Sequence, residues 1–170
     1  MNNSVKKIAL ISILITLSIV LSYVDSLIIL PFAIPGIKLG IANIATVYTL
    51  FRIGIKESII VSIFRIILSS ILFGTILSFS YSLAGAALSL ALMIILKRFI
   101  KISLITISIL GAIMHNVGQI LMAMILLETK EIILYLPVLV ITGTIAGIGV
   151  GLLSILTLKY TKNIKLNINN

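Results

Sequence analysis

A few polar side chains interrupt long apolar stretches of this chain, and these side chains are the ones able to do chemistry. They include an arginine within FRIILSS and three polar residues within GAIMHNVGQI. Guanidinium, ammonium, imidazole and amide groups hold anionic or heteroaromatic molecules through hydrogen bonds. The candidate substrate-binding residues are Lys38, Asn43, Arg65, His115, Asn116 and Gln119.

The sequence lacks the residues that metal and cofactor sites require. The chain has no cysteine and one histidine, so thiolate and histidine-rich metal sites are excluded. No cluster of aspartates is present to hold Mg²⁺ on a diphosphate, and no phosphate-binding loop, dinucleotide fingerprint or nucleophile elbow occurs. We therefore expect no metal, no cofactor and no catalytic residue, and we predict that the chain is not an enzyme by itself.

Composition places the polar residues inside a membrane. The 170 residues are 61% apolar and 10% charged, with a mean hydropathy of +1.34. A soluble domain is about 45–50% apolar and about 25% charged. The sequence therefore predicts an all-α integral membrane bundle of about six transmembrane helices, forming a single polytopic domain over residues 1–170.

The basic residues give this bundle an orientation. Of 13 lysines and arginines, ten fall in alternate junctions between apolar stretches, whereas the other junctions hold two, Lys38 and Lys130. Cytoplasmic loops carry such an excess, so both termini are expected in the cytoplasm. The basic residues responsible for the formal charge of +9 then form a rim beside lipid headgroups, and no nucleic-acid partner is expected.

One predicted span is too short to cross a bilayer unaided. The predicted spans are residues 8–24, 39–52, 55–73, 78–96, 102–127 and 132–158. The second would be about 21 Å long against a hydrocarbon core of about 30 Å. Residues 31–36 before it form an apolar loop broken by proline and glycine, which we expect to be a lid or pocket wall. The serines around Tyr81 are expected in an interfacial turn.

Each candidate side chain has a structural alternative. Arg65 either snorkels to the interface or bonds a backbone carbonyl, or it contacts an anionic substrate. His115, Asn116 and Gln119 either join helices by hydrogen bonds or form a ligand-binding face. Lys38 is either an interfacial anchor or a cation over a substrate cavity, and it is a possible partner for Asp25.

Small residues in the last span predict close helix packing. Gly143, Gly147 and Gly151 recur every four residues in TGTIAGIGVGLL. This doubled G-x-x-x-G pattern lets another backbone approach, which favours intramolecular packing, with a partner-protein face as the alternative.

Five motifs together resemble one bacterial membrane family. The motifs are PGIKLGIANI (35–44), FRIILSSILFGT (64–75), SYSLAGAALS (80–89), GAIMHNVGQI (111–120) and YLPVLVITGTIAG (135–147). The chain resembles the Gx transporter family, also labelled heptaprenyl diphosphate synthase component I. Such proteins are similar to the six-helix substrate-binding subunits of energy-coupling-factor transporters.

The resemblance implies capture and uptake of a small anionic or vitamin-like substrate at a bacterial cell membrane. The implied partners are the substrate, the bilayer and a coupling subunit with ATPases. The chain departs from the family by Asp25 in place of glutamate, and from such transporters by lacking an alanine-x-x-x-alanine face in the first span. The alternative function is a non-catalytic accessory subunit of heptaprenyl diphosphate synthase, which supports prenyl-quinone side-chain synthesis.

The charge pattern predicts the result of a labelling experiment. Cysteines introduced at Asn3 and Thr161 should be shielded from an impermeant thiol reagent in intact cells, whereas one at Thr129 should react. Labelling at either terminus in intact cells would overturn the orientation.

Overall fold

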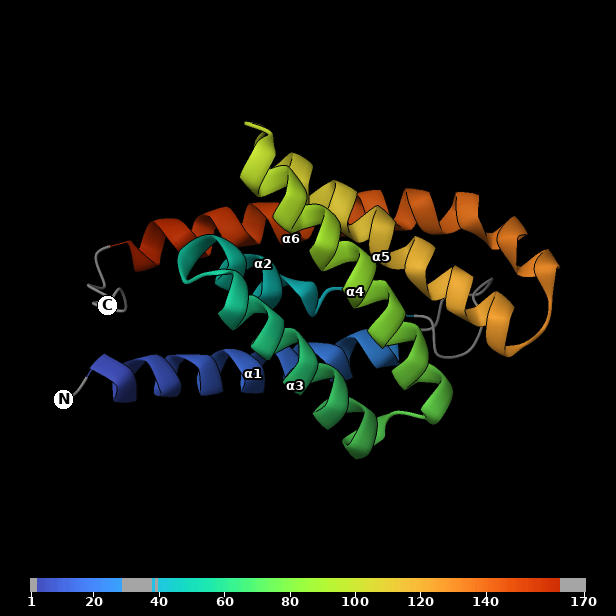
Figure 1. Ribbon diagram of the computed structural model, residues 1–170, viewed down its shortest axis with the longest axis horizontal. Helices are drawn as coiled ribbons and strands as arrows, with labels where there is room; N and C mark the ends of the chain where they lie inside the picture. Colours follow the sequence, from blue (N-terminus) through green and yellow to red (C-terminus); the bar gives the residue numbers. More distant parts are fainter. Residues whose placement is uncertain (1–2, 29–37, 39, 163–170) are drawn as a thin grey trace.

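The computed structural model describes residues 3–28, 38 and 40–162, and all regular elements in these ranges are helices (Figure 1). They are α1 (Asn3–Leu27), α2 (Asn43–Arg52), α3 (Ile55–Phe73), α4 (Ile76–Phe99), α5 (Leu104–Leu126), a 3₁₀ helix η1 (Lys130–Tyr135) and α6 (Leu136–Thr161). Four stretches in the described part are long and apolar enough to span a membrane: most of α1, α4, α5 and the continuous stretch Lys130–Thr161. The chain is thus an all-α, multi-pass membrane protein, and the count of six spans stays a prediction.

Polar side chains decide where the middle helices begin. The Thr75 hydroxyl accepts a hydrogen bond from the Ser78 N–H at 3.1 Å, and the Ser103 hydroxyl accepts one from the Thr106 N–H at 3.1 Å. Such caps satisfy N–H groups that the first helical turn leaves without partners. Helix α4 therefore begins at Ile76, earlier than the predicted start at residue 78.

The other boundaries shift for local reasons. Helix α1 extends beyond residue 24 and includes Asp25, whose side chain is buried. Helix α2 begins later than residue 39, because Gly40 adopts a left-handed φ of +85° that ends any helical path before it. Helix α6 begins after residue 132, because the 3₁₀ helix precedes it and Pro137 stands in its first turn.

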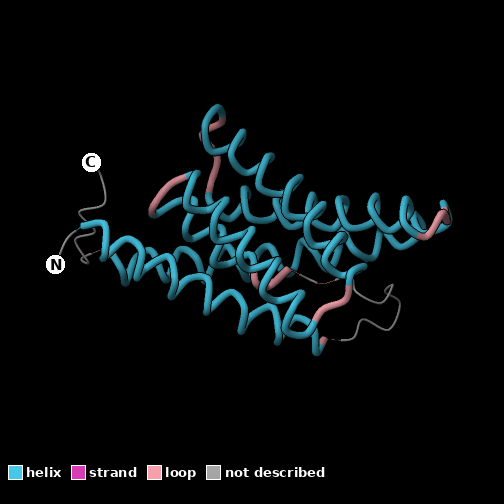
Figure 2. Tube along the Cα trace, turned by 60° about the horizontal axis from the view of Figure 1, so that its bottom comes forward, coloured by secondary structure: helices cyan, strands magenta, loops and turns pink. Residues whose placement is uncertain are grey.

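Helix α5 lies at the centre of one half of the molecule, packed along α4 on one side and α6 on the other (Figure 1). Helix α1 packs on α3, and the short α2 contacts both α3 and α6 (Figures 1 and 2). Glycines bring the backbones together: a Cβ at Gly147 would lie 2.6 Å from Ile109 Cα, and one at Gly118 would lie 2.7 Å from Gly85 Cα. Contacts this close are open only to glycine.

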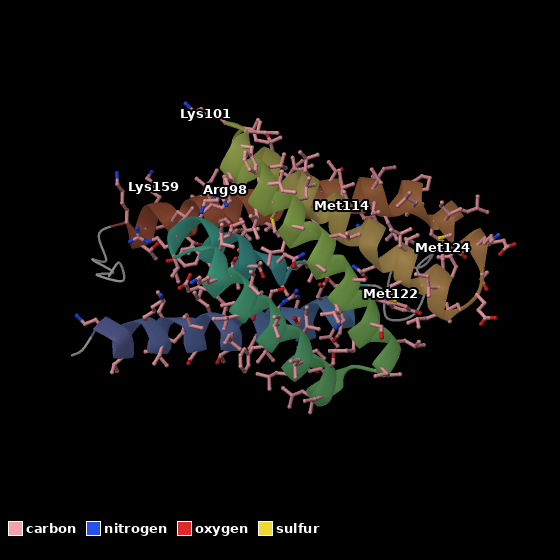
Figure 3. All side chains as sticks on the ribbon, in the orientation of Figure 1. Arg98, Lys101, Met114, Met122, Met124 and Lys159 are labelled. Atoms are coloured by element: carbon pink, nitrogen blue, oxygen red, sulfur yellow. The ribbon has the colours of Figure 1, made fainter. Side chains whose placement is uncertain are left out.

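The start of α1 and the end of α6 lie on the same side of the molecule (Figure 1). Arg98, Lys101 and Lys159 lie toward that side (Figure 3). Arg52, at the end of α2, donates a hydrogen bond to the Thr161 carbonyl at 2.9 Å. A cation at a helix C-terminus pairs with carbonyls that the helix cannot satisfy, so this contact joins the ends of α2 and α6.

The outer surface of the bundle is apolar, and its interior holds buried polar side chains beside three apolar clusters. Aliphatic side chains are exposed along the long helices, as expected of surfaces that face lipid. Serines instead lie buried between α1 and α3 and along α4. The predicted interfacial turn around Tyr81 is wrong, because Tyr81 lies within α4 and is 0% exposed.

Two glycines of α6 offer a matched test of this packing. Gly147→Ala should lower the free energy of unfolding by about 1–3 kcal/mol, because its methyl group would meet the α5 backbone. Gly149→Ala should leave stability unchanged or slightly raised, since no atom lies within 4 Å of a Cβ there. Unfolding in mild detergent measures both, and equal melting temperatures would contradict the close α5–α6 contact.

Candidate functional site

Gln119 of α5 holds the chain that leads into α2. Its Oε1 accepts a hydrogen bond from the Lys38 backbone N–H at 2.9 Å, and its Nε2 donates one to the Lys38 carbonyl at 2.9 Å. Gln119 is fully buried, so both ends of its amide are satisfied by one residue. The side-chain amide of Gln119 therefore binds the backbone N–H and C=O of one residue, as a residue of a neighbouring β-strand would.

Asp25 of α1 holds the same segment from another side. Its Oδ2 accepts a hydrogen bond from the Gly40 N–H at 2.8 Å, and the residue is 3% exposed. Gly40 needs to be glycine there, because its φ is +85° and a Cβ would lie 2.9 Å from Asn43 Nδ2. Helices α1 and α5 thus fix the entry to α2 at two adjacent places.

Arg65 extends from α3 to the start of α2 inside the bundle. Its Nη2 donates to Asn43 Oδ1 at 3.2 Å, and the residue is 5% exposed. Its charge interacts with that of Asp25. Among the described residues, no acceptor meets its buried Nε. The guanidinium therefore does not snorkel to the interface, and part of its donor capacity is unused.

His115 joins this group, whereas Asn116 does not. His115 is buried against Gly85 and Gly40, and it interacts electrostatically with Arg65. Asn116, one residue on, points toward α6, where its Nδ2 donates to the Leu139 carbonyl at 2.6 Å. The observed contact of Asn116 therefore joins α5 to α6.

The Lys38 side chain completes the group with a second cation. Its Nζ lies 5.7 Å from the centre of the Phe73 ring. Burial lowers the pKa of the Lys38 ammonium, the Asp25 carboxylate acts in the opposite direction, and Arg65 lowers this pKa further. The expected pairing of Asp25 with Lys38 is thus present as an electrostatic interaction.

A small cavity of about 10 Å³ lies beside the group, next to Gly40 and Asn43. This volume is close to that of one water probe. Two buried serines, Ser89 and Ser108, line it, and the Ser108 hydroxyl has no partner in the described part of the chain. A molecule larger than water must therefore move neighbouring side chains to enter.

The structure brings five of the six predicted site residues together and adds Asp25 and Gly40. We name this set the polar site: Asp25, Lys38, Gly40, Asn43, Arg65, His115 and Gln119. Binding by these residues stays a prediction, and residues 31–36, the expected lid, lie outside the described residues. The sequence did carry a spacing that includes Asp25: serines stand seven positions, about two helical turns, before three site residues, in the pairs Ser18–Asp25, Ser58–Arg65 and Ser108–His115. The structure buries all three serines.

A family model described as heptaprenyl diphosphate synthase component I matches residues 14–157, a range that includes the whole polar site. No curated protein and no solved structure matches the chain.

The two hydrogen bonds of Gln119 predict an exchange pattern. Gln119→Leu should speed deuterium exchange of the Lys38 amide by about five- to tenfold, because a bond worth about 1 kcal/mol is lost. Gln119→Glu should have a smaller effect, since a carboxylate still accepts from this amide but cannot donate to the Lys38 carbonyl. Equal exchange in all three proteins would contradict the arrangement.

Proposed function

The chain belongs to the heptaprenyl diphosphate synthase component I family, and on this premise we propose that it captures a small anionic substrate within the membrane for uptake. In this proposal it acts as the substrate-binding subunit of a transporter of the energy-coupling-factor type, with a separate coupling subunit and ATPases. The observation that carries the proposal is the buried guanidinium of Arg65 at the start of α2.

Energetics support a binding role for Arg65. Placing an arginine at the centre of a transmembrane helix costs about 2.5–3.5 kcal/mol on insertion scales. Its hydrogen bond to Asn43 leaves other donors of the guanidinium available, including the buried Nε, so packing alone is a weak reason to bury it. Broken helices in transporters direct their N-termini at anionic substrate groups, and α2 is a helix of 10 residues that starts beside Arg65.

A second function is favoured by the description of the family. A non-catalytic component I of heptaprenyl diphosphate synthase would hold an anionic prenyl diphosphate at the membrane for a separate catalytic subunit. Both functions use an anion site and need no catalytic residue in this chain. Prenyl transfer by the catalytic subunit, measured with and without the purified protein, separates them, because a transport subunit leaves that rate unchanged.

The proposal is tested by comparing two arginines. Arg65→Met removes the buried cation, whereas Arg98→Met removes an exposed cation at the end of α4. Native mass spectrometry of gently purified protein detects a co-purifying small molecule, and its occupancy is compared among the variants. Arg65→Met should reduce affinity by about ten- to a hundredfold, the loss expected for a charged hydrogen bond, and Arg98→Met should retain the molecule.

A double variant separates binding from folding. Arg65→Met alone leaves Asp25 with fewer compensating charges, so its melting temperature should fall. Arg65→Met with Asp25→Asn removes both members of the pair, and stability should recover while binding does not. Recovery of both stability and occupancy in the double variant would show that Arg65 has a structural role only.

A further inference from the structure

The charges of the polar site do not cancel. Asp25, Lys38 and Arg65 come from three different segments, and each interacts electrostatically with the other two. Two cations and one carboxylate leave a formal charge of +1, with His115 counted as neutral. Asp25 and Arg65 are 3% and 5% exposed, so water screens this pair poorly, whereas Lys38 is half-buried and its charge is screened in part.

The other carboxylates of the described residues lie elsewhere. Glu57 pairs with Lys7 at 2.6 Å near the start of α3. Lys38 lies beside Phe73, at the other end of this helix. Glu128 and Glu131 are exposed after the end of α5. Asp25 is therefore the carboxylate that sets the charge of the polar site.

The start of α2 lies beside these charges and places a buried donor of Arg65 next to them. No side chain caps its N-terminus, and its first residue, Asn43, accepts from Arg65. The Asn43 and Ile44 N–H groups donate to the Gly40 and Ile41 carbonyls at 3.0 and 3.1 Å, which offsets part of the positive charge of this helix end. The Nε of Arg65, buried without an acceptor among the described residues, is therefore a donor for one added anion.

We propose that the polar site selects molecules with one negative charge, and that Asp25 is the residue that determines this selectivity. The inference rests on the proposed function, since it names the charge class of the substrate. A monoanion brings the formal charge of the polar site to zero. A dianion leaves a buried negative excess and a neutral molecule leaves a positive one, and both are unfavourable in a low-dielectric interior.

Three small probes of similar shape but different charge test the proposal. Acetate, malonate and acetamide are titrated at pH 7.5 and constant chloride into full-length protein in nanodiscs of phosphatidylcholine, with thermal unfolding as the readout. In the wild type, acetate should bind at least about tenfold more tightly than malonate or acetamide, given the strength of charge interactions in a buried site. Malonate binding as tightly as acetate would overturn the proposal.

Substitution of Asp25 should change the preferred charge. Asp25→Asn raises the formal charge to +2, so malonate affinity relative to acetate should rise by about tenfold or more. Glu57→Gln removes a carboxylate outside the polar site, and the preference for acetate should stay. An unchanged preference in Asp25→Asn would overturn the role of Asp25.

A charge-balanced variant keeps the test decisive if Asp25→Asn does not fold. Asp25→Asn combined with Lys38→Met restores a formal charge of +1, and acetate should again be preferred. Lys38→Met alone has no net charge and should lose the preference for acetate over acetamide. Retained preference in Lys38→Met would contradict selection by charge.

One further arm identifies the source of the anion. Phosphatidylglycerol, whose headgroup carries one negative charge, is added to the discs. Weaker acetate binding then indicates a lipid headgroup as occupant, whereas unchanged binding indicates a soluble monoanion, and both results support the proposal. Failure of all three probes, together with an empty protein in native mass spectrometry, would reject the proposed function itself, whereas binding without charge preference would reject only the inference.

Discussion

The need to satisfy a guanidinium away from water organises one half of this molecule. Arg65 is buried in α3, and the amide oxygen of Asn43 meets it. That contact holds the first residue of α2 inside the bundle, and Lys38 and Gly40, which precede the helix, lie beside it without helical structure of their own. Asp25 and Gln119 then supply the partners that this segment lacks, as the absence of water in a bilayer requires.

The other half is organised by backbone proximity. Glycines on α4, α5 and α6 let these helices approach until backbone atoms touch, and few polar contacts are needed there. Asn116 supplies one such contact, to the Leu139 carbonyl. A closely packed set of three helices thus stands beside α1, α2 and α3, and His115 on α5 faces Arg65 across the boundary.

The sequence was sufficient for the fold class and for most of the polar site. Apolar stretches predicted helices, and rare polar residues in them had to face inward, because lipid offers no hydrogen bonds. The position of Tyr81 was not predictable in the same way: serines and a tyrosine near a turn resemble an interfacial belt, and only the packing of α4 on α5 buries them. The predicted first span ends at residue 24, before Asp25, because a carboxylate is seldom found inside a membrane helix. The structure includes Asp25 in α1, where the Gly40 N–H from another segment donates a hydrogen bond to it.

The hydrogen bonds of Gln119 have a consequence for how this family can diversify. The side chain of Gln119 bonds the main chain of residue 38, and the Lys38 side chain takes no part in these two bonds. Any amino acid with a backbone N–H can therefore occupy position 38 without loosening the attachment, and only proline is incompatible with it. The side chain at this position is thus free to vary in charge and size while the backbone stays in place, which makes residue 38 a natural point for evolution or engineering to change what the protein recognises.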